Sequence, residues 1–143
     1  MKPRIAWVVY DLPYPTNSGG KLRAYNLIKY LSRDFEIDLY SFYRRQSQFS
    51  HLAELKKYCR EIKIYRRNYI WSPFNLARAL FSAKPLLNIS YFNRQLEKDL
   101  LGTVTKNVYS LVHFEFLGVA NLLPKLSKMG MKTFGLILLL SRM

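Results

Sequence analysis

The chain opens on the apolar run RIAWVVY at residues 4–10, which a loop separates from GGKLRAYNLIKYLSR at residues 19–33. The first run is short, rich in β-branched and aromatic residues and bounded by turn residues, which predicts a buried strand. The second predicts a helix over 20–33, because Ala24, Leu27, Ile28 and Leu31 recur at the spacing of one helical face. A buried strand followed by a helix is typical of a parallel sheet covered by helices.

The same alternation of strand and helix patterns continues along the rest of the chain. Further strands are expected at 35–42, 61–66, 109–115 and 132–140, and helices at 50–58, 72–81, 90–106 and 117–129. Ser50 is expected to cap the first of these helices, and Gly130 to end the last. We therefore expect one α/β domain over residues 1–143, a doubly wound, Rossmann-like parallel sheet of about five strands in the order 3-2-1-4-5.

The composition limits the chemistry that this chain can perform. Half of the 143 residues are hydrophobic, enough for the core of one domain. The single cysteine, Cys59, excludes an internal disulfide and a multi-cysteine metal site, and we expect it to be a small core residue. Two histidines, His51 and His113, exclude a three-histidine metal site. We expect neither a metal ion nor a cofactor.

No apolar run is long enough to span a bilayer. The longest, residues 134–140, has seven residues, whereas a membrane helix needs about 20. Lys2 and Arg4 before the first apolar run imitate a signal peptide, but Asp11 and Pro13 end that run too early. We expect a cytoplasmic protein that associates peripherally with the inner face of the membrane.

The formal net charge of +14 predicts a polyanionic partner. Residues 44–98 carry twelve basic and three acidic side chains, interleaved with Tyr65, Tyr69, Trp71, Phe74 and Phe81. Basic and aromatic residues together suit an anionic membrane surface, and they suit nucleic acid as well. The sequence lacks a recognition-helix motif and an aromatic RNA-binding signature, so nucleic acid is the less favoured partner. A solvated basic face over ordinary core aromatics is the remaining alternative.

Two adjacent glycines, Gly19 and Gly20, stand between the first expected strand and its helix. In sheets of the expected order, ligands bind beyond the carboxyl ends of the strands, where the strand order reverses. Glycines let backbone N–H groups approach a ligand, and the start of a helix favours an anion. Lys21 and Arg23 add positive charge, which makes them candidates for phosphate or acceptor contacts. The alternative is that the glycines only permit a turn with positive φ.

The spacings of two well-known nucleotide-binding motifs are missing from this turn. The dinucleotide fingerprint G-x-G-x-x-G is absent, and no glycine precedes the Gly20-Lys21 pair at P-loop spacing. A second candidate pair, His113 and Glu115, alternates along the expected fourth strand near its carboxyl end. Both residues are candidates for binding an acceptor, with a buried core histidine as the alternative for His113.

The stretch from Ile5 to Leu31 resembles the opening of the family 4 glycosyltransferases, which are enzymes of the two-Rossmann-domain, GT-B type. The resemblance rests on Pro13-Tyr14-Pro15, on Gly19-Gly20-Lys21-Leu22-Arg23 and on Asn26-Leu27 in the following helix. It continues through residues 36–42, and Val112-His113-Phe114-Glu115 followed by Leu117-Gly118 resembles the family's fourth strand and loop. The similarity covers residues 4–42 and 109–130.

This resemblance implies an enzyme with two facing domains and the active site between them. The N-terminal domain would hold the acceptor, and Gly19 and Gly20 would face the diphosphate of a nucleotide-sugar donor. Transfer in the family retains the anomeric configuration and needs no metal. A separate C-terminal domain would bind the donor through a basic pair and a Glu-x7-Glu motif.

The sequence departs from the family pattern in its last part. The donor-binding domain with its Glu-x7-Glu motif is absent, and the expected strand at 132–140 runs into Ser141-Arg142-Met143 without a polar loop. We therefore expect a truncated or frameshifted glycosyltransferase that used a glycan or lipid-linked acceptor in polysaccharide or glycoconjugate assembly. The alternative is a non-catalytic module that binds glycan or anionic lipid, or docks onto a separate donor domain.

The missing donor half generates a first prediction. The purified chain alone should neither hydrolyse nor transfer sugar from any member of a panel of UDP- and GDP-sugars, because the groups that hold the nucleotide are absent. Nucleotide release is the measurement, and turnover above a buffer control would contradict the expectation.

Overall fold

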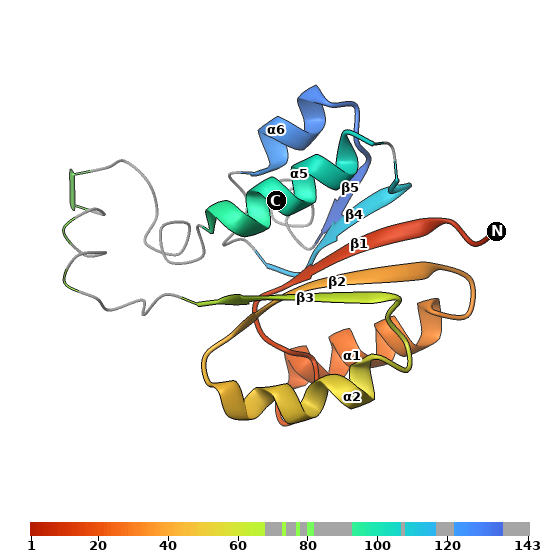
Figure 1. Cartoon of the computed structure of the whole chain (residues 1–143), viewed down its shortest axis with the longest axis vertical. Coiled ribbons are helices and arrows are strands. Elements are labelled where there is room, and N and C mark those ends of the chain that lie inside the picture. Colours follow the sequence, from red (N-terminus) through yellow and green to blue (C-terminus); the bar gives the residue numbers. More distant parts are fainter. Residues whose placement is uncertain are drawn as a thin grey trace.

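The structure, a computed structural model, describes residues 1–67, 93–106, 108–116 and 122–135 and the isolated positions 73, 77, 80 and 81. Within these residues, five strands form one parallel sheet in the order β3-β2-β1-β4-β5. The strands are β1 (Arg4–Val9), β2 (Glu36–Tyr43), β3 (Glu61–Arg66), β4 (Leu111–Phe114) and β5 (Thr133–Gly135). This is the expected doubly wound, Rossmann-like α/β fold (Figure 1).

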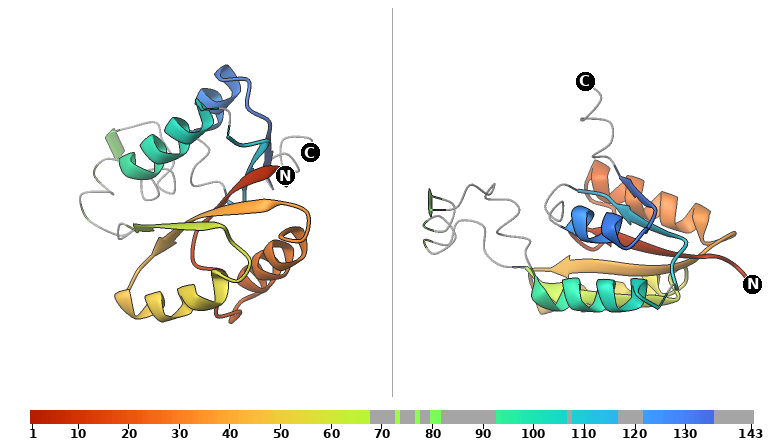
Figure 2. Two further views of the ribbon diagram at one scale, coloured as in Figure 1. Left: turned by 45° about the vertical axis from the view of Figure 1, so that its right-hand side comes forward. Right: turned by 90° about the horizontal axis from the view of Figure 1, so that it is seen from above.

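Helices cover both faces of this sheet (Figure 2). One face carries α1 (Gly19–Leu31), the 3₁₀ helix η1 (Gln46–His51) and the short helix α2 (Leu52–Leu55), and the other carries α5 (Arg94–Val104) and α6 (Leu123–Lys128). None of the described helices is long and apolar enough to cross a membrane.

Strand β1 is the central strand, paired on one edge with β2 and on the other with β4. Its Val8 lies between Tyr40 of β2 and Phe114 of β4. Residues 5–9 of β1 are buried, because helices lie over both faces of the strand. A near-continuous apolar run is what a parallel strand buried on both faces requires, and RIAWVV supplies it.

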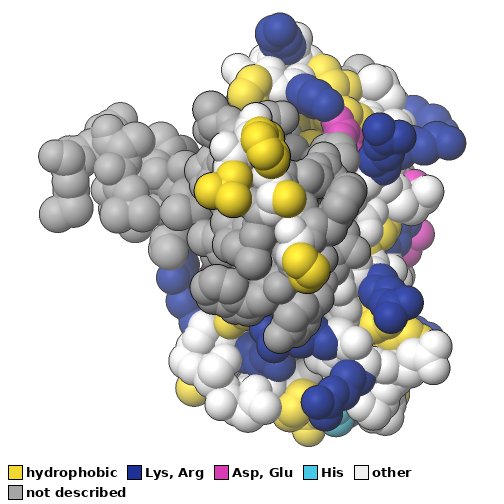
Figure 3. All heavy atoms as spheres, turned by 90° about the vertical axis from the view of Figure 1, so that its left-hand side faces the viewer, with side chains coloured by type: hydrophobic (Ala, Val, Ile, Leu, Met, Phe, Trp, Pro, Cys, Tyr) yellow, Lys and Arg dark blue, Asp and Glu magenta, His cyan; other side chains and the backbone are white. Residues whose placement is uncertain are grey.

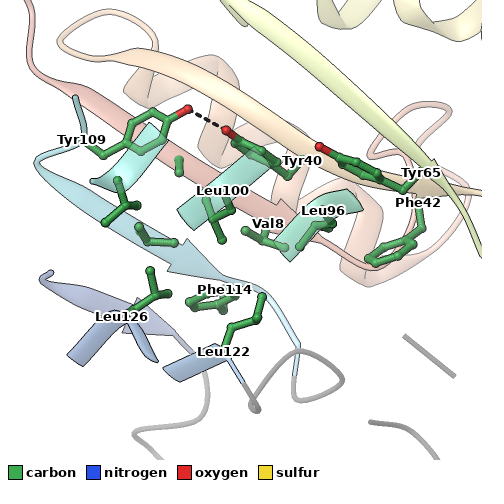
Figure 4. Close-up of a cluster of buried hydrophobic side chains, with 13 residues drawn as sticks. Val8, Tyr40, Phe42, Tyr65, Leu96, Leu100, Tyr109, Phe114, Leu122 and Leu126 are labelled. Atoms are coloured by element: carbon green, nitrogen blue, oxygen red, sulfur yellow. Dashed lines mark hydrogen bonds between the residues drawn. The ribbon is translucent and has the colours of Figure 1, made fainter. Parts of the chain in front are cut away.

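Each face of the sheet has its own hydrophobic core. On the α5 and α6 side, Leu96, Leu100 and Leu126 pack against Val8 and Phe114 (Figure 4). On the α1 and α2 side, the core residues are Ile5, Trp7, Val9, Leu12, Ala24, Ile28, Ile37, Leu39, Leu55 and Cys59. The expectation for Cys59 is confirmed: it is buried, and burial raises the pKa of its thiol to about 12, so it stays protonated.

A polar chain crosses the core on the α5 side. The buried carboxylate of Asp38 accepts hydrogen bonds from Arg60 and from the Tyr109 hydroxyl, which lies 2.9 Å away. The Tyr109 hydroxyl also lies 2.8 Å from that of Tyr40 (Figure 4). Burial, followed by the hydrogen bond with Tyr40, raises the pKa of Tyr109, so the hydroxyl stays neutral. Both donors bond to Oδ2 of Asp38, whereas its buried Oδ1 has no hydrogen-bond partner among the described residues.

The predicted boundaries agree best where the hydrophobic pattern is clean. Strand β3 has the predicted bounds, and Gly130, with a φ of 69°, ends α6 as predicted. Ser50 was wrong as an N-cap: it lies inside η1, and its hydroxyl donates to the Ser47 carbonyl. The cap of α5 is Asn93, whose side chain accepts from the backbone of Gln95 and Leu96.

Strand β2, predicted at 35–42, keeps its length and is shifted by one residue to Glu36–Tyr43, whereas several other elements are shorter than predicted. The helix predicted at 90–106 is described as α5, Arg94–Val104. Strand β4, predicted at 109–115, is Leu111–Phe114, and α6, predicted at 117–129, begins at Leu123. Of the predicted helix at 72–81, six of the ten positions lie outside the described residues. So do residues 90–92, 117–121 and 136–140, and with them the Leu117-Gly118 match and most of the predicted fifth strand.

The polar chain through Tyr109 can be tested by stability. Tyr109→Phe should lower the free energy of unfolding by about 1–3 kcal/mol, because it leaves the buried Asp38 carboxylate with fewer donors. Tyr30→Phe is the matched control, since Tyr30 is 63% exposed, and it should change stability by less than about 0.5 kcal/mol. Urea denaturation measures both variants, and equal stability of the two would show that the hydrogen bonds of Tyr109 contribute nothing to the free energy of unfolding.

Candidate functional site

A pocket of about 120 Å³ lies at the carboxyl ends of β1 and β4, beside the first turn of α1. Its lining comes from three parts of the chain: Val9 at the end of β1 with Tyr10, Asp11 and Pro13 after it; Gly20, Lys21, Arg23 and Ala24 from α1; and Glu115 after β4. Strand order reverses between β1 and β4. The pocket therefore occupies the position where ligands bind in sheets of this class.

Helix α1 begins at this pocket with free backbone donors. Ser18 is the N-cap, and its hydroxyl accepts from the Lys21 backbone N–H at 3.4 Å. The Leu22 N–H donates to the Ser18 carbonyl. The N–H groups of Gly19 and Gly20 have no acceptor among the described residues. Free N–H groups at the positive end of a helix favour an anion.

The two glycines of this turn differ in their surroundings. Neither has a positive φ, since Gly130 is the only such glycine among the described residues. Conformational freedom therefore does not explain them. A Cβ at Gly19 would meet nothing within 4 Å, whereas a Cβ at Gly20 would lie 3.1 Å from the Tyr10 hydroxyl. Space restricts Gly20 alone.

Lys21 is held by a carboxylate. Its ammonium lies 3.3 Å from Asp11, and both side chains are nearly nine-tenths buried. The other Asp11 oxygen accepts from the Leu12 backbone and from the Gln48 side-chain amide. The Gln48 carbonyl oxygen in turn accepts from the backbone of Arg44 and Arg45. This chain of bonds, which we call the Asp11–Gln48 link, fastens the loop after β1 to the segment after β2.

Arg23 is the pocket cation without an ion-pair partner among the described residues. It is exposed and lines the pocket, two positions after Lys21. A guanidinium offers a planar set of donors that matches phosphate and carboxylate oxygens. The positive charge available to a ligand at this site therefore comes from Arg23 more than from Lys21.

Glu115 enters the pocket from the opposite side. Its carboxylate lies 3.1 Å from Nε2 of His113, and both side chains are at least nine-tenths buried. The His113 ring packs on Trp7, with ring centroids 4.1 Å apart. The sequence predicted that both residues alternate along the fourth strand; His113 lies in β4 and Glu115 directly after it, and their side chains meet. Glu115 lines the pocket, whereas His113 lies in the core and bonds to Glu115.

The structure thus brings Gly20, Lys21, Arg23 and Glu115 into one pocket, with Gly19 beside it and His113 behind it. Sequence reasoning missed Asp11 and Gln48. Asp11 had a usable signal, because a polar residue directly after a buried strand stands at the ligand edge of a parallel sheet. Gln48 had none, since no local pattern relates residues 11 and 48.

The pocket balances two carboxylates against two cations. A carboxylate accepts hydrogen bonds from hydroxyl groups, and a guanidinium and free amides donate to phosphate. The arrangement therefore suits a ligand that combines hydroxyl and phosphate groups. Among the described residues, no group of three His, Cys, Asp or Glu side chains could hold a metal ion.

Comparisons with known proteins bear on the fold. No protein-family model matches the chain, and no curated protein sequence matches it. The crystal structure of the glycosyltransferase TcCGT1 in complex with UDP overlays with a TM-score of 0.51 at 8% identity. The match covers 94% of this chain and 28% of that chain, so this chain spans less than a third of TcCGT1.

A second solved structure, phenylacrylic acid decarboxylase from Aquifex aeolicus, gives a TM-score of 0.38 at 15% identity, covering 94% of this chain and 81% of that chain. A TM-score this low does not indicate a common fold. The likeness to TcCGT1 is one of fold, a Rossmann-like domain that a glycosyltransferase also contains.

The unequal surroundings of the two glycines give a stability prediction. Gly19→Ala should raise the free energy of unfolding by about 0.4–1 kcal/mol, because alanine restricts the unfolded chain and meets open space. Gly20→Ala should lose that gain, since the Tyr10 hydroxyl must move. In a Tyr10→Phe background the gain should return. Urea denaturation of the four variants is the measurement, and equal effects at both glycines in the natural background would contradict it.

Proposed function

We propose that this chain is the acceptor-side, N-terminal domain of a nucleotide-sugar-dependent glycosyltransferase of the family 4 type. The observation that carries the proposal is the pocket at the β1–β4 switch point, lined by Gly20, Arg23 and Glu115 among others. Its chemistry matches both partners of a sugar transfer, a phosphate on one side and a hydroxyl on the other.

The donor diphosphate would lie against the first turn of α1. The free N–H groups of Gly19 and Gly20 and the guanidinium of Arg23 all serve a phosphate there. Lys21 would contribute less, because Asp11 already compensates its charge. Donors fixed in this way would stabilise the negative charge that grows on the departing nucleotide diphosphate.

The acceptor hydroxyl would face Glu115. A carboxylate accepts a hydrogen bond from the attacking hydroxyl and orients it, and His113 holds that carboxylate in place. Transfer would retain the anomeric configuration and need no metal, as in the family that residues 4–42 and 109–130 resemble. The rest of the donor site would come from a second Rossmann-like domain.

The fold likeness to TcCGT1, a structure solved with UDP, supports a glycosyltransferase origin for this domain. We propose a nucleotide-sugar as donor substrate and a glycan or lipid-linked molecule as acceptor, in polysaccharide or glycoconjugate assembly. A non-catalytic subunit that docks onto a separate donor domain is the other form in which the same pocket could work.

The diphosphate site can be tested on the chain alone. UDP and inorganic pyrophosphate should both shift the backbone amide NMR signals of Gly19, Gly20 and Lys21, and uridine should not, because the pocket grips the phosphates. Arg23→Gln should weaken this binding by about tenfold or more, the usual worth of a hydrogen bond to a charged group.

The control is Lys106→Gln, which removes the same charge at the exposed end of α5, on the other face of the sheet. It should leave the titration unchanged. Shifts that uridine reproduces, or that persist unaltered in Arg23→Gln, would remove the support for a phosphate site at α1.

A further inference from the structure

The outward face of α1 is basic and partly apolar. The helix carries Lys21, Arg23 and Lys29 and no acidic residue, and Arg33 follows it. The residues that it exposes, with Arg33 included, are Gly19, Gly20, Leu22, Arg23, Asn26, Lys29, Tyr30 and Arg33. Leu22 is 47% and Tyr30 63% exposed. The α1 surface therefore combines several cations with one aliphatic and one aromatic side chain.

The turn after α2 continues this surface. The Lys29 ammonium lies 5.9 Å from the centre of the Tyr58 ring, and the Tyr25 hydroxyl donates to Glu54. Lys56 and Lys57 are exposed at the same place. Arg23 belongs to the pocket, so we call the other exposed side chains, Leu22, Asn26, Lys29, Tyr30, Arg33, Lys56 and Lys57, the α1 face.

Acidic residues offset only part of this charge. Segments 19–34 and 44–60 together hold nine basic residues and two acidic ones, Asp34 and Glu54. Three of the nine form ion pairs, Lys21 with Asp11, Lys57 with Glu54 and Arg60 with Asp38, and the other six have no ion-pair partner among the described residues. The hydrogen bond from Lys57, then that from Tyr25, lowers the pKa of Glu54, so this carboxylate is ionised and already compensated. Figure 3, which views the carboxyl ends of the strands, shows Lys and Arg side chains along the lower part, where α1 and α2 lie.

We propose that the α1 face docks on an anionic lipid bilayer. Cations at a membrane surface are attracted by anionic headgroups, and an exposed tyrosine takes its place at headgroup depth. The exposed aliphatic Leu22 favours a bilayer over nucleic acid, because a phosphate backbone offers it no apolar contact. The α1 face overlaps the basic segment 44–98 only at Lys56 and Lys57, and most of residues 68–92 of that segment lie outside the described residues.

The orientation that follows has a geometric consequence. The pocket lies at the amino end of α1, so a bilayer along the α1 face would lie beside the pocket rim. A lipid-borne ligand could then reach Glu115 without leaving the membrane. The docking itself does not rest on the proposed transferase function, because it depends only on charge and exposed side chains.

Vesicle cosedimentation with the full chain tests the proposal. Binding should occur to phosphatidylglycerol–phosphatidylcholine vesicles and not to pure phosphatidylcholine. The double variant Lys29→Gln/Arg33→Gln should bind about 25-fold more weakly, since each cation near an anionic surface is worth about fivefold. The matched control Lys106→Gln/Lys128→Gln removes the same charge from the opposite face. It should change binding by less than about threefold, because distant charges are screened.

A third variant tests whether the Tyr30 ring contributes to vesicle binding in addition to the charges. Tyr30→Ser should weaken vesicle binding and leave its salt dependence unchanged, while a thermal melt shows that the fold is intact. Equal losses in both double variants would show attraction by net charge and overturn the α1 face. Failure to bind anionic vesicles, or release from them by an equal charge of duplex DNA, would overturn the membrane as its partner.

Discussion

Strand β1 is hydrogen-bonded along both edges and buried on both faces, and the other elements are placed by this constraint. Crossovers between parallel strands are right-handed, so the chain must place α1 on one face on its way to β2 and α5 on the other before β4. The connections that follow β1 and β4 therefore diverge. They leave between them the recess that Gly20, Arg23 and Glu115 line.

The sequence was informative where one local pattern determines the outcome. Alternating apolar residues gave β3 its observed bounds, and the strand order followed from crossover rules. Capping was harder to predict: Ser18 and Asn93 cap α1 and α5, whereas Ser50, an equally acceptable cap by residue type, lies inside η1. In the pocket, the glycine turn after β1 and Glu115 after β4 could be predicted to lie near one another, because both follow the carboxyl ends of adjacent parallel strands. The Asp11–Gln48 link could not, since it joins residues 37 positions apart.

The charge of the whole chain and the charge of the pocket have different roles. The net charge of +14 is spread over the surface, where it acts at long range. Inside the pocket, Asp11 and Glu115 offset Lys21 and Arg23, so the local balance is even. A balanced pocket distinguishes ligands by the geometry of their hydrogen bonds. On the unbalanced surface, charge attracts polyanions in general, and the exposed apolar side chains must distinguish among them.

The Asp11–Gln48 link also restricts which mutations this chain can accept. Gln48 accepts two backbone N–H groups through its oxygen and donates to the Asp11 carboxylate through its nitrogen. Glutamate has the same shape and could still accept, but at neutral pH it would set a second carboxylate against Asp11. Spontaneous deamidation of Gln48 would have the same result. Loss of the Gln48 amide nitrogen would therefore remove a donor from Asp11 and weaken the Asp11–Gln48 link beside the pocket, although Gln48 is remote from the pocket in sequence.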